Sequence, residues 1–264
     1  TKQADAGIDL GLFNQRVNLT VDYYNKTTDG LLSNRFIPWE FGAQSIPYNV
    51  GSIRNYGMDV ELSVGSRQNA KVMWRVETNM NFNRNKVLSL ADSVISYGTF
   101  IFGGPQSNVK VGQAVGSVQV YNSLGVDPQT GDMIYEDRNK DGLFNVKDMI
   151  YVPIALPKFT GGTTLTAGYK RVTVEALFSY VVGTKIYDYY EQSLRNYDMD
   201  WFGVMPNKFD IVNSRWRKPG DVTEVPRATV GQHGPGKTTD WNYRPSTQFV
   251  YDASYLRLRN LMVS

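Results

Sequence analysis

Hydrophobic and polar residues alternate along several segments of the chain, and this period of two predicts β-strands. Over residues 72–82, apolar or aromatic side chains with one threonine, beginning with Val72 and Trp74, alternate with side chains that are charged or amide apart from one methionine. Three further segments show the same division: residues 17–24, 58–64 and 172–182. Because successive side chains of a strand point to opposite faces, each strand separates an oily medium from a wet one. The oily medium is either a protein core or lipid.

The predicted strands come in pairs, with short turns at one end and long excursions at the other. The expected strands cover residues 8–13, 17–25, 53–64, 71–83, 159–168, 172–183 and 251–263. The long excursions cover residues 27–52, 85–157 and 184–249, and a helical turn or two is expected only near residues 188–196. Compact soluble domains rarely contain structureless loops longer than about 15 residues, whereas outer-membrane barrels regularly combine short turns with long loops. The sequence therefore predicts an all-β fold, an antiparallel transmembrane β-barrel segment with long extracellular loops.

The composition excludes several functional classes. With no cysteine among its 264 residues, the chain has no disulfide framework, no cysteine-ligated zinc and no cysteine nucleophile. Its one histidine, His233, lies in the glycine-rich run 231–236, which would hold a catalytic base poorly. The net charge of +3, without a block of basic residues, gives no reason to expect nucleic-acid binding. The strand carboxylates could form a glycosidase pair, but they more often line a solvated lumen, so we do not expect an enzyme.

Residues 137–148 have the spacing of an EF-hand-like calcium loop. The expected ligands are the side chains of Asp137, Asn139, Asp141, Asn145 and Asp148 and the main-chain carbonyl of Leu143. Gly142 lies at the sixth position, where such a loop turns sharply, but the twelfth position is Asp instead of the usual Glu. A turn rich in Asp, Asn and Gly that binds no metal is the alternative. No cofactor is required, and a bound Ca2+ would stiffen an external loop.

Five motifs, in order along the chain, carry a resemblance to a known family. The run Asn-Val-Gly-Ser-Ile-Arg-Asn-Tyr-Gly over residues 49–57 resembles a hallmark of the SusC/RagA family of TonB-dependent outer-membrane transporters. The other four motifs lie in residues 11–29, 81–87, 131–142 and 253–260. They are similar to the family's Gly-Leu-Phe to Asp-Tyr-Tyr hairpin, its Asn-x-Asn-Lys-Val strand end, its Gly-Asp loop motif and its late Ser-Tyr-Leu-Arg-Leu-Arg-Asn strand.

The resemblance implies a bacterial outer-membrane barrel of about 22 strands around an N-terminal plug. Such a protein imports oligosaccharides or peptides with energy relayed by the TonB complex, and a SusD-like surface lipoprotein covers it as a lid. Residues 1–264 resemble the middle to C-terminal part of the barrel domain, with a long extracellular loop region at 85–157. The plug and the TonB box are absent from this sequence, so we expect it to be a fragment of a longer protein.

The alternation assigns side chains to the two sides of this barrel. The expected lumen-facing residues are Asp59, Glu61, Arg75, Glu77 and Glu175. The expected lipid-facing residues are Val17, Leu19, Val60, Leu62, Trp74, Val76, Val174 and Phe178. Candidate aromatic contacts for a sugar or for the lid are Trp39, Phe41, Trp201, Trp216 and Trp241. The alternative for each of these rings is packing within its own loop.

Two other functions fit parts of the sequence. One is a soluble extracellular β-sandwich that binds carbohydrate and is stabilised by calcium, although such a fold expects strands at a regular spacing of about 8–12 residues. The other is a passive porin or adhesin barrel without TonB coupling. Solubility without detergent would favour the first, and an upstream plug would exclude the second.

Overall fold

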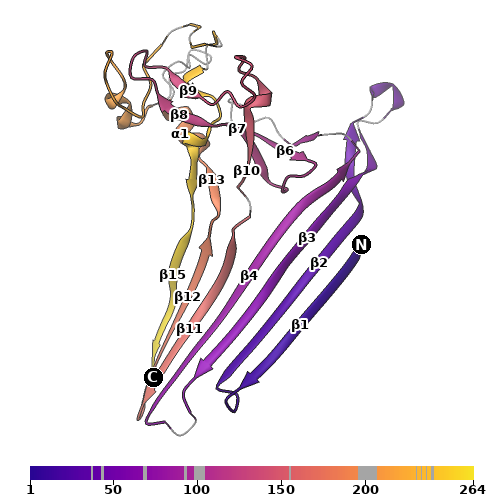
Figure 1. Cartoon of the computed structure of the whole chain (residues 1–264), viewed down its shortest axis with the longest axis vertical. Coiled ribbons are helices and arrows are strands. Elements are labelled where there is room, and N and C mark those ends of the chain that lie inside the picture. Colours follow the sequence, from indigo (N-terminus) through magenta and orange to yellow (C-terminus); the bar gives the residue numbers. More distant parts are fainter. Residues whose placement is uncertain are drawn as a thin grey trace.

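The computed structural model contains one large sheet and a lobe formed by the long loops (Figure 1). It describes residues 1–36, 38–42, 45–67, 70–91, 94–97, 105–154, 156–195, 207–229, 231–232, 234–235, 237–238 and 241–264. Within these ranges the large sheet has seven antiparallel strands, in the order β1-β2-β3-β4-β11-β12-β15. Their bounds are β1 (Lys2–Leu12), β2 (Val17–Phe36), β3 (Ser45–Gly65), β4 (Val72–Leu90), β11 (Phe159–Tyr169), β12 (Val172–Val182) and β15 (Tyr255–Val263).

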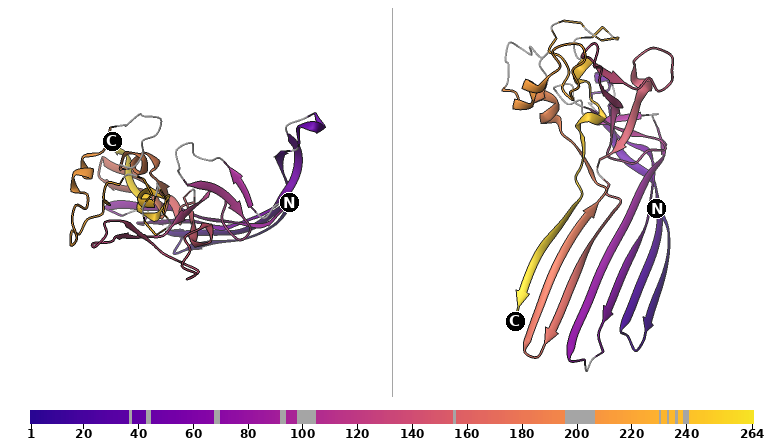
Figure 2. Two further views of the ribbon diagram at one scale, coloured as in Figure 1. Left: turned by 90° about the horizontal axis from the view of Figure 1, so that it is seen from above. Right: turned by 60° about the vertical axis from the view of Figure 1, so that its left-hand side comes forward.

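The sheet is curved. Seen from above, its strands form an arc whose edge strands, β1 and β15, do not pair with each other (Figure 2). The short turns lie at one end of the strands and the loop lobe at the other (Figure 1). Each strand predicted from the alternation has a counterpart in this sheet, although the predicted strand 251–263 is divided: Tyr255–Val263 is β15, and Val250–Asp252 is β14, which belongs to a separate two-stranded sheet. The curvature of the large sheet is that of a segment of barrel wall.

The lengths of β2, β3 and β4 correct the prediction, because these strands run far past the predicted ends. They contain 20, 21 and 19 residues. The stretch 27–52, predicted as an excursion, is largely a hairpin of β2 with β3, closed by the 3-10 turn η1 (Trp39–Phe41). Pro47 of this hairpin lies beyond Gly51, where β3 no longer has β4 as a neighbour, and an edge strand tolerates a missing N–H.

The register across the sheet sorts the side chains into an apolar face and a polar face. One row on the apolar face, read from β1 to β15, is Leu10, Leu19, Leu62, Thr78, Thr163, Phe178 and Leu258. The row next to it, on the polar face, is Asp9, Thr20, Glu61, Asn79, Gly162, Ser179 and Arg257. The alternation within each strand therefore continues across the whole sheet.

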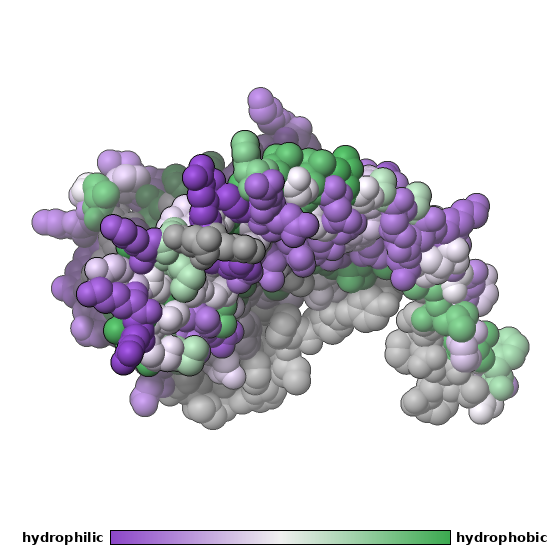
Figure 3. Space-filling model, turned by 90° about the horizontal axis from the view of Figure 1, so that it is seen from below, coloured by the Kyte–Doolittle hydropathy of each residue, from purple (hydrophilic) through white to green (hydrophobic). Residues whose placement is uncertain are grey.

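The apolar face is open to its surroundings and forms a continuous band. Side chains in the middle of the sheet, such as Trp74 and Leu165, are 43% and 41% exposed, and hydrophobic residues gather along the convex side of the arc (Figure 3). From Trp74 to Phe82 on β4 the band measures about 27 Å along the strand at about 3.4 Å per residue. This is the scale of the roughly 25 Å band of outer-membrane barrels. An exposed apolar surface of this size must be covered by lipid or by other protein.

Aromatic side chains mark both borders of the band. Trp74 and Tyr169 lie at the border near the short turns. Tyr23 and Phe82 lie at the opposite border, where the ring of Phe82 packs 5.5 Å from that of Phe159. Because aromatic girdles occur at both interfaces of membrane barrels, these rings place the two edges of a bilayer on the sheet.

Three hydroxyl groups on the apolar face satisfy one another. The hydroxyls of Thr78 and Thr163 are hydrogen-bonded at 2.8 Å, and Thr78 also lies 3.1 Å from the hydroxyl of Tyr180. Tyr180 lies across Gly161, where any Cβ would collide with its ring. Since an unpaired polar group in hydrocarbon is strongly destabilising, this network lets polar side chains occupy the middle of an apolar band.

Most of the buried hydrophobic side chains lie in the loop lobe, which comprises the described parts of residues 94–154 and 184–252; Val87, near the end of β4, is buried as well. Its strands are β5 (Val94–Tyr97), β6 (Gln106–Lys110), β7 (Ser117–Tyr121), β8 (Ser123–Val126), β9 (Met133–Tyr135), β10 (Met149–Pro153), β13 (Lys185–Tyr187) and β14 (Val250–Asp252). Its helical elements are α1 (Tyr189–Arg195), which confirms the expected helix, and the 3-10 turns η2 (Val146–Asp148), η3 (Asp210–Ser214), η4 (Trp241–Tyr243) and η5 (Thr247–Phe249). Two clusters of buried side chains form its core, one around Tyr121 and Trp241 and the other around Val118 and Val152. In the part of the chain that is described, no helix has the length and apolarity to cross a bilayer.

The second and third excursions are joined into this single lobe by buried and partly buried polar contacts. Asn242, with no exposed surface, accepts a hydrogen bond from the main-chain N–H of Met133 at 2.9 Å. Arg227 donates two hydrogen bonds to the carboxylate of Asp132, at 2.8 and 3.0 Å. The N–H of Tyr121 donates to the carbonyl of Pro245 at 2.8 Å. Long loops that make such contacts form a folded body instead of separate flexible segments.

A charge placed at the centre of the apolar band tests its contact with lipid. Leu19→Arg is expected to destabilise the protein in phospholipid vesicles by about 2–4 kcal/mol, and Val174→Arg, which lies near the border, by about 0–1 kcal/mol. The matched control is Asn18→Arg, one residue away on the polar face, which should have little effect. Denaturant titration of the reconstituted protein measures the three values, and an equal loss in Leu19→Arg and Asn18→Arg would contradict the lipid-facing assignment.

Candidate functional site

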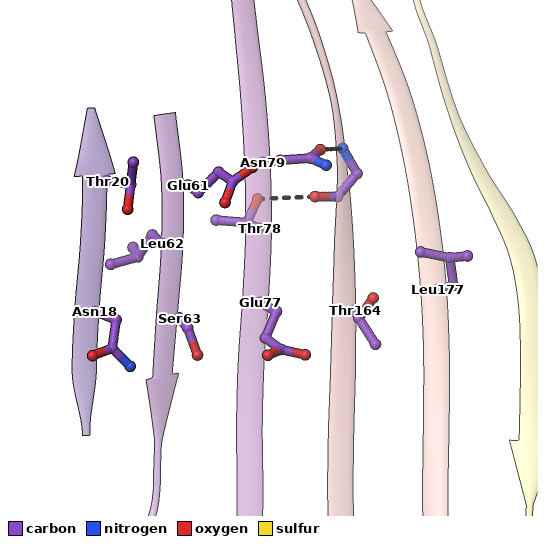
Figure 4. Close-up of a pocket in the computed structure, with 11 residues that line it drawn as sticks. Asn18, Thr20, Glu61, Leu62, Ser63, Glu77, Thr78, Asn79, Thr164 and Leu177 are labelled. Atoms are coloured by element: carbon purple, nitrogen blue, oxygen red, sulfur yellow. Dashed lines mark hydrogen bonds between the residues drawn. The ribbon is translucent and has the colours of Figure 1, made fainter. Parts of the chain in front are cut away.

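The polar face of the sheet forms a shallow concavity that is the first candidate for function. A cavity of about 320 Å³ is lined there by side chains from β2, β3, β4, β11 and β12, among them Asn18, Thr20, Glu61, Ser63, Glu77 and Thr164. Figure 4 shows these side chains next to one another across the strands. Hydroxyl, amide and carboxylate groups therefore face the inside of the arc.

Hydrogen bonds between neighbouring strands hold these polar side chains in place. Thr20 donates to the carboxylate of Asp9 at 2.7 Å, and the side-chain amide of Asn81 donates to the carboxylate of Asp59. The carbonyl oxygen of the Asn79 side chain accepts from the N–H of Gly162 at 2.7 Å (Figure 4). Such contacts stiffen the wall and leave its outer polar atoms available to water or solute.

The structure places the five predicted lumen residues on this one face. Asp59 and Glu61 follow each other on β3, and Arg75 and Glu77 on β4. Glu175 shares a row with Arg75 through Thr166. Arg75 and Glu77 form an ion pair with an N–O distance of 3.3 Å, but both side chains are about half exposed, so the pair adds little stability.

Charge is unevenly distributed over the polar face. The carboxylates of Asp9, Asp22, Asp59, Glu61 and Glu77 lie on β1 to β4. At the other side of the arc, β15 carries Arg257 and Arg259, and Arg259 donates to the hydroxyl of Ser179 at 3.0 Å. On this face β1 to β4 therefore carry more acidic than basic side chains, even with Arg75 on β4, whereas the edge strand β15 carries two arginines.

The polar face also includes residues beyond the five that the sequence named as lumen-facing. Asp9, Asn18 and Asn79 belong to it through the same register as the predicted residues. The alternation of Arg257 and Arg259 with leucines in the last strand was the available signal. Only the pairing of strands far apart in sequence shows that these residues share one surface.

A glycine explains part of the 49–57 motif. Gly57 lies where any Cβ would collide with the hydroxyl of Tyr24 and with the carbonyl of Phe82. Tyr24 belongs to the Asp-Tyr-Tyr motif and pairs with Gly57 across β2 and β3. The two motifs are therefore two halves of one contact, in which a tyrosine covers a glycine on the polar face.

The 137–148 loop is held by hydrogen bonds within itself. Asp137 accepts from the N–H of Gly142 at 2.8 Å, and Asp141 accepts from the N–H of Leu143 at 2.8 Å. Gly142 is left-handed, with φ 74°. Asp148 is fully buried and accepts from the N–H groups of Arg138 and Asn145, at 3.2 and 2.9 Å. The sharp turn is therefore at Gly142, the sixth residue of the loop, as the spacing of an EF-hand-like loop predicts.

The donor set of this loop fits a hard cation in part. One carboxylate oxygen of Asp137 is buried and finds no hydrogen-bond partner among the described residues. Across the described ranges, however, no three acidic, cysteine or histidine side chains converge as a metal site. A calcium ion here would depend on the oxygens of Asn139, Asn145 and Leu143 as much as on carboxylates, which is chemistry that Ca2+ accepts.

Two of the candidate aromatic residues make their contacts within the loop lobe, Trp241 buried and Trp216 half-buried. Trp241 is 1% exposed; its indole N–H donates to the carbonyl of Met133 at 2.9 Å, and its ring lies 4.9 Å from that of Phe144. Trp216 donates to the carbonyl of Pro128 at 2.9 Å and covers Gly131. The burial of Trp241 differs from the open ring that sugar stacking requires, because this side chain is used to join two loops.

The other candidate aromatics have different positions. Phe41 is 74% exposed, in the turn η1 at the tip of the β2–β3 hairpin. The backbone of Trp39 lies in the same turn. Trp201, like His233, lies outside the described residues.

A family model described as TonB dependent receptor-like, beta-barrel, matches residues 1–200. Among curated proteins, TonB-dependent receptor P39 of Formosa agariphila is 28% identical, over 100% of this chain and 29% of that protein. TonB-dependent receptor SusC of Bacteroides thetaiotaomicron is 27% identical, over 97% of this chain and 25% of that protein. The chain thus spans between a quarter and three tenths of the length of these relatives.

Solved structures show the same fold. The RagAB peptide transporter matches 99% of this chain and 28% of its own, with a TM-score of 0.76 and 24% identity. The RagAB peptide importer in the open-open state matches with a TM-score of 0.74 and 25% identity, over 99% of this chain and 27% of its own. The resemblance to SusC/RagA transporters is confirmed by these matches. The sheet is curved, with one apolar and one polar face, and the family model matches most of the chain. The chain therefore belongs to the TonB-dependent receptor β-barrel family of the outer membrane.

Proposed function

We propose that this chain is part of the barrel of an active importer of oligosaccharides, powered through TonB and covered by a SusD-like surface lipoprotein. The observation that carries the proposal is the single curved wall with an apolar convex face and a polar concave face. A wall of this kind separates lipid from a water-filled passage. Import of peptides is the alternative substrate class.

The similar proteins support this function in different ways. SusC is named a TonB-dependent receptor, and RagAB is described as a peptide transporter and importer. The concave face offers carboxylates, hydroxyls and amides, such as Glu61, Thr20 and Asn79. These groups can exchange hydrogen bonds with the hydroxyl groups of a sugar as well as with a peptide, so the wall alone suits either solute.

The energy source separates an active importer from a passive porin. In cells that carry the full-length gene, deletion of the TonB gene is expected to abolish uptake of a fluorescent oligosaccharide, because the passage opens only when energy is relayed to the plug. Uptake of free glucose by other porins is the control and should not change. Oligosaccharide uptake that persists without TonB would contradict the proposal and favour a passive barrel, and uptake of labelled peptides alone would contradict the substrate class.

We further infer that residues 137–148 hold one structural calcium ion. The spacing of the oxygen donors, the left-handed Gly142 and the unpartnered buried oxygen of Asp137 support it. The ion would be supplied from outside the cell, where loops of this kind bind with dissociation constants of about 10⁻⁴–10⁻³ M. It would stabilise the loop lobe and take no part in transport chemistry.

Calcium binding by this loop can be measured without any transport assay. Terbium luminescence of the purified full-length protein should rise on binding, be displaced by Ca2+, and be lost in Asp137→Asn, which removes a charged ligand. Asp221→Asn, an acidic turn residue elsewhere in the lobe, is the matched control and should behave as wild type. Absence of displaceable terbium at about 10 mM Ca2+, tenfold above the weakest expected constant, would show that the loop is a metal-free turn.

A further inference from the structure

A second cavity lies in the loop lobe, and none of its residues belongs to the seven-stranded sheet. Its volume is about 420 Å³, within the range of about 300–1,000 Å³ that is usual for small-molecule sites. Its walls include Asp127, Thr130, Asp132, Ile134, Phe144 and Pro235. It therefore combines hydrogen-bonding groups from the turn before β9 with apolar groups from β9 and the 137–148 loop.

The polar wall of this cavity is made of acceptors in fixed positions. Asp127 accepts from the N–H of Gln129 and from the hydroxyl of Thr130, each at 2.8 Å. These two hydrogen bonds lower the pKa of Asp127 below its usual value, so the group is an anion at neutral pH. Asp132 is neutralised by Arg227, whereas none of the described residues forms an ion pair with Asp127. The wall thus carries one uncompensated negative charge.

The apolar wall is equally well fixed. Phe144 is held by Trp241, with ring planes at 90° and centroids 4.9 Å apart. Trp241 is itself anchored in the core through Met133. Ile134, beside them on β9, is 40% exposed. Rings and side chains that are held in this way lose little conformational entropy when they bind a ligand.

We infer that this cavity binds one neutral pyranose unit of an oligosaccharide. A pyranose presents C–H groups on its ring faces and hydroxyl donors around its rim, which match the apolar wall at Phe144 and Ile134 and the acceptors of Asp127. A uronic acid or a sulfated sugar would bring a second negative charge to Asp127 and is excluded by repulsion. The inference rests on the proposed import of oligosaccharides and adds a capture site outside the passage, with a preference for uncharged sugars.

Calorimetric titration of the purified full-length protein tests this site directly. The probes are maltohexaose, mannohexaose and xylohexaose as neutral chains, and hexagalacturonate as the acidic chain. At least one neutral chain should bind, hexagalacturonate should not, and Asp127→Asn should weaken neutral binding by about 3- to 10-fold, the loss that corresponds to one hydrogen bond. Asn keeps the turn, because its side-chain oxygen can accept the same N–H.

The matched control is Asp221→Asn, which changes another acidic turn of the lobe. Asp221 accepts from the N–H groups of Arg217 and Lys218, each at 3.0 Å, and does not line the cavity. It should leave sugar affinity unchanged. Equal weakening in both variants, equal affinity for hexagalacturonate, or failure of every neutral chain to bind would overturn the inference, as would binding of a basic peptide in place of sugar.

The failure of this site can be told apart from the failure of the proposed function. If cells import an oligosaccharide through TonB while Asp127→Asn binds it as tightly as wild type, only the cavity is wrong. If cells import peptides and no oligosaccharide, the proposed substrate class is wrong, and the sugar site loses the function on which it rests.

Discussion

The difference in polarity between the two faces of one sheet is the constraint on which the rest of the structure depends. Each strand turns its hydrophobic side chains to the convex side and its polar side chains to the concave side. In lipid, every main-chain N–H and C=O must find a partner within the sheet, and antiparallel pairing supplies those partners on both sides of each strand that lies between the edge strands β1 and β15. The aromatic borders, the hydroxyl network around Thr78 and the concentration of buried side chains in the loop lobe all follow from this constraint.

The loop lobe is under a different constraint, because long loops in water must bury enough apolar surface to fold. It does so by joining two excursions that are about a hundred residues apart in sequence. Trp241, Asn242 and Arg227 of the third excursion meet Asp132 and Met133 of the second. Since this core is independent of lipid, the lobe can present fixed cavities and turns at one end of the wall.

The sequence was informative where the physics is local. Alternation along a strand depends only on the medium at each face, so the strands and the common face of Glu61, Glu77 and Glu175 could be predicted. Contacts between distant segments could not be read in this way. The pairing within residues 27–52 depends on where β4 ends, and the burial of Trp241 depends on a partner, Met133, over a hundred residues earlier in the chain. The cavity beside Phe144 likewise exists only once two loops meet.

The most direct test of the two-faced wall is a spin-label scan along β4. Single cysteines at positions 73 to 81, placed in the full-length protein in phospholipid vesicles, would carry nitroxides whose collisions with oxygen and with a water-soluble nickel complex are measured. The account predicts a period of two, with positions 74, 76, 78 and 80 open to oxygen and positions 75, 77, 79 and 81 open to nickel. If positions 74, 76, 78 and 80 are closed to both reagents, the apolar face is a protein core. The assignment of the sheet to a barrel wall would then be wrong.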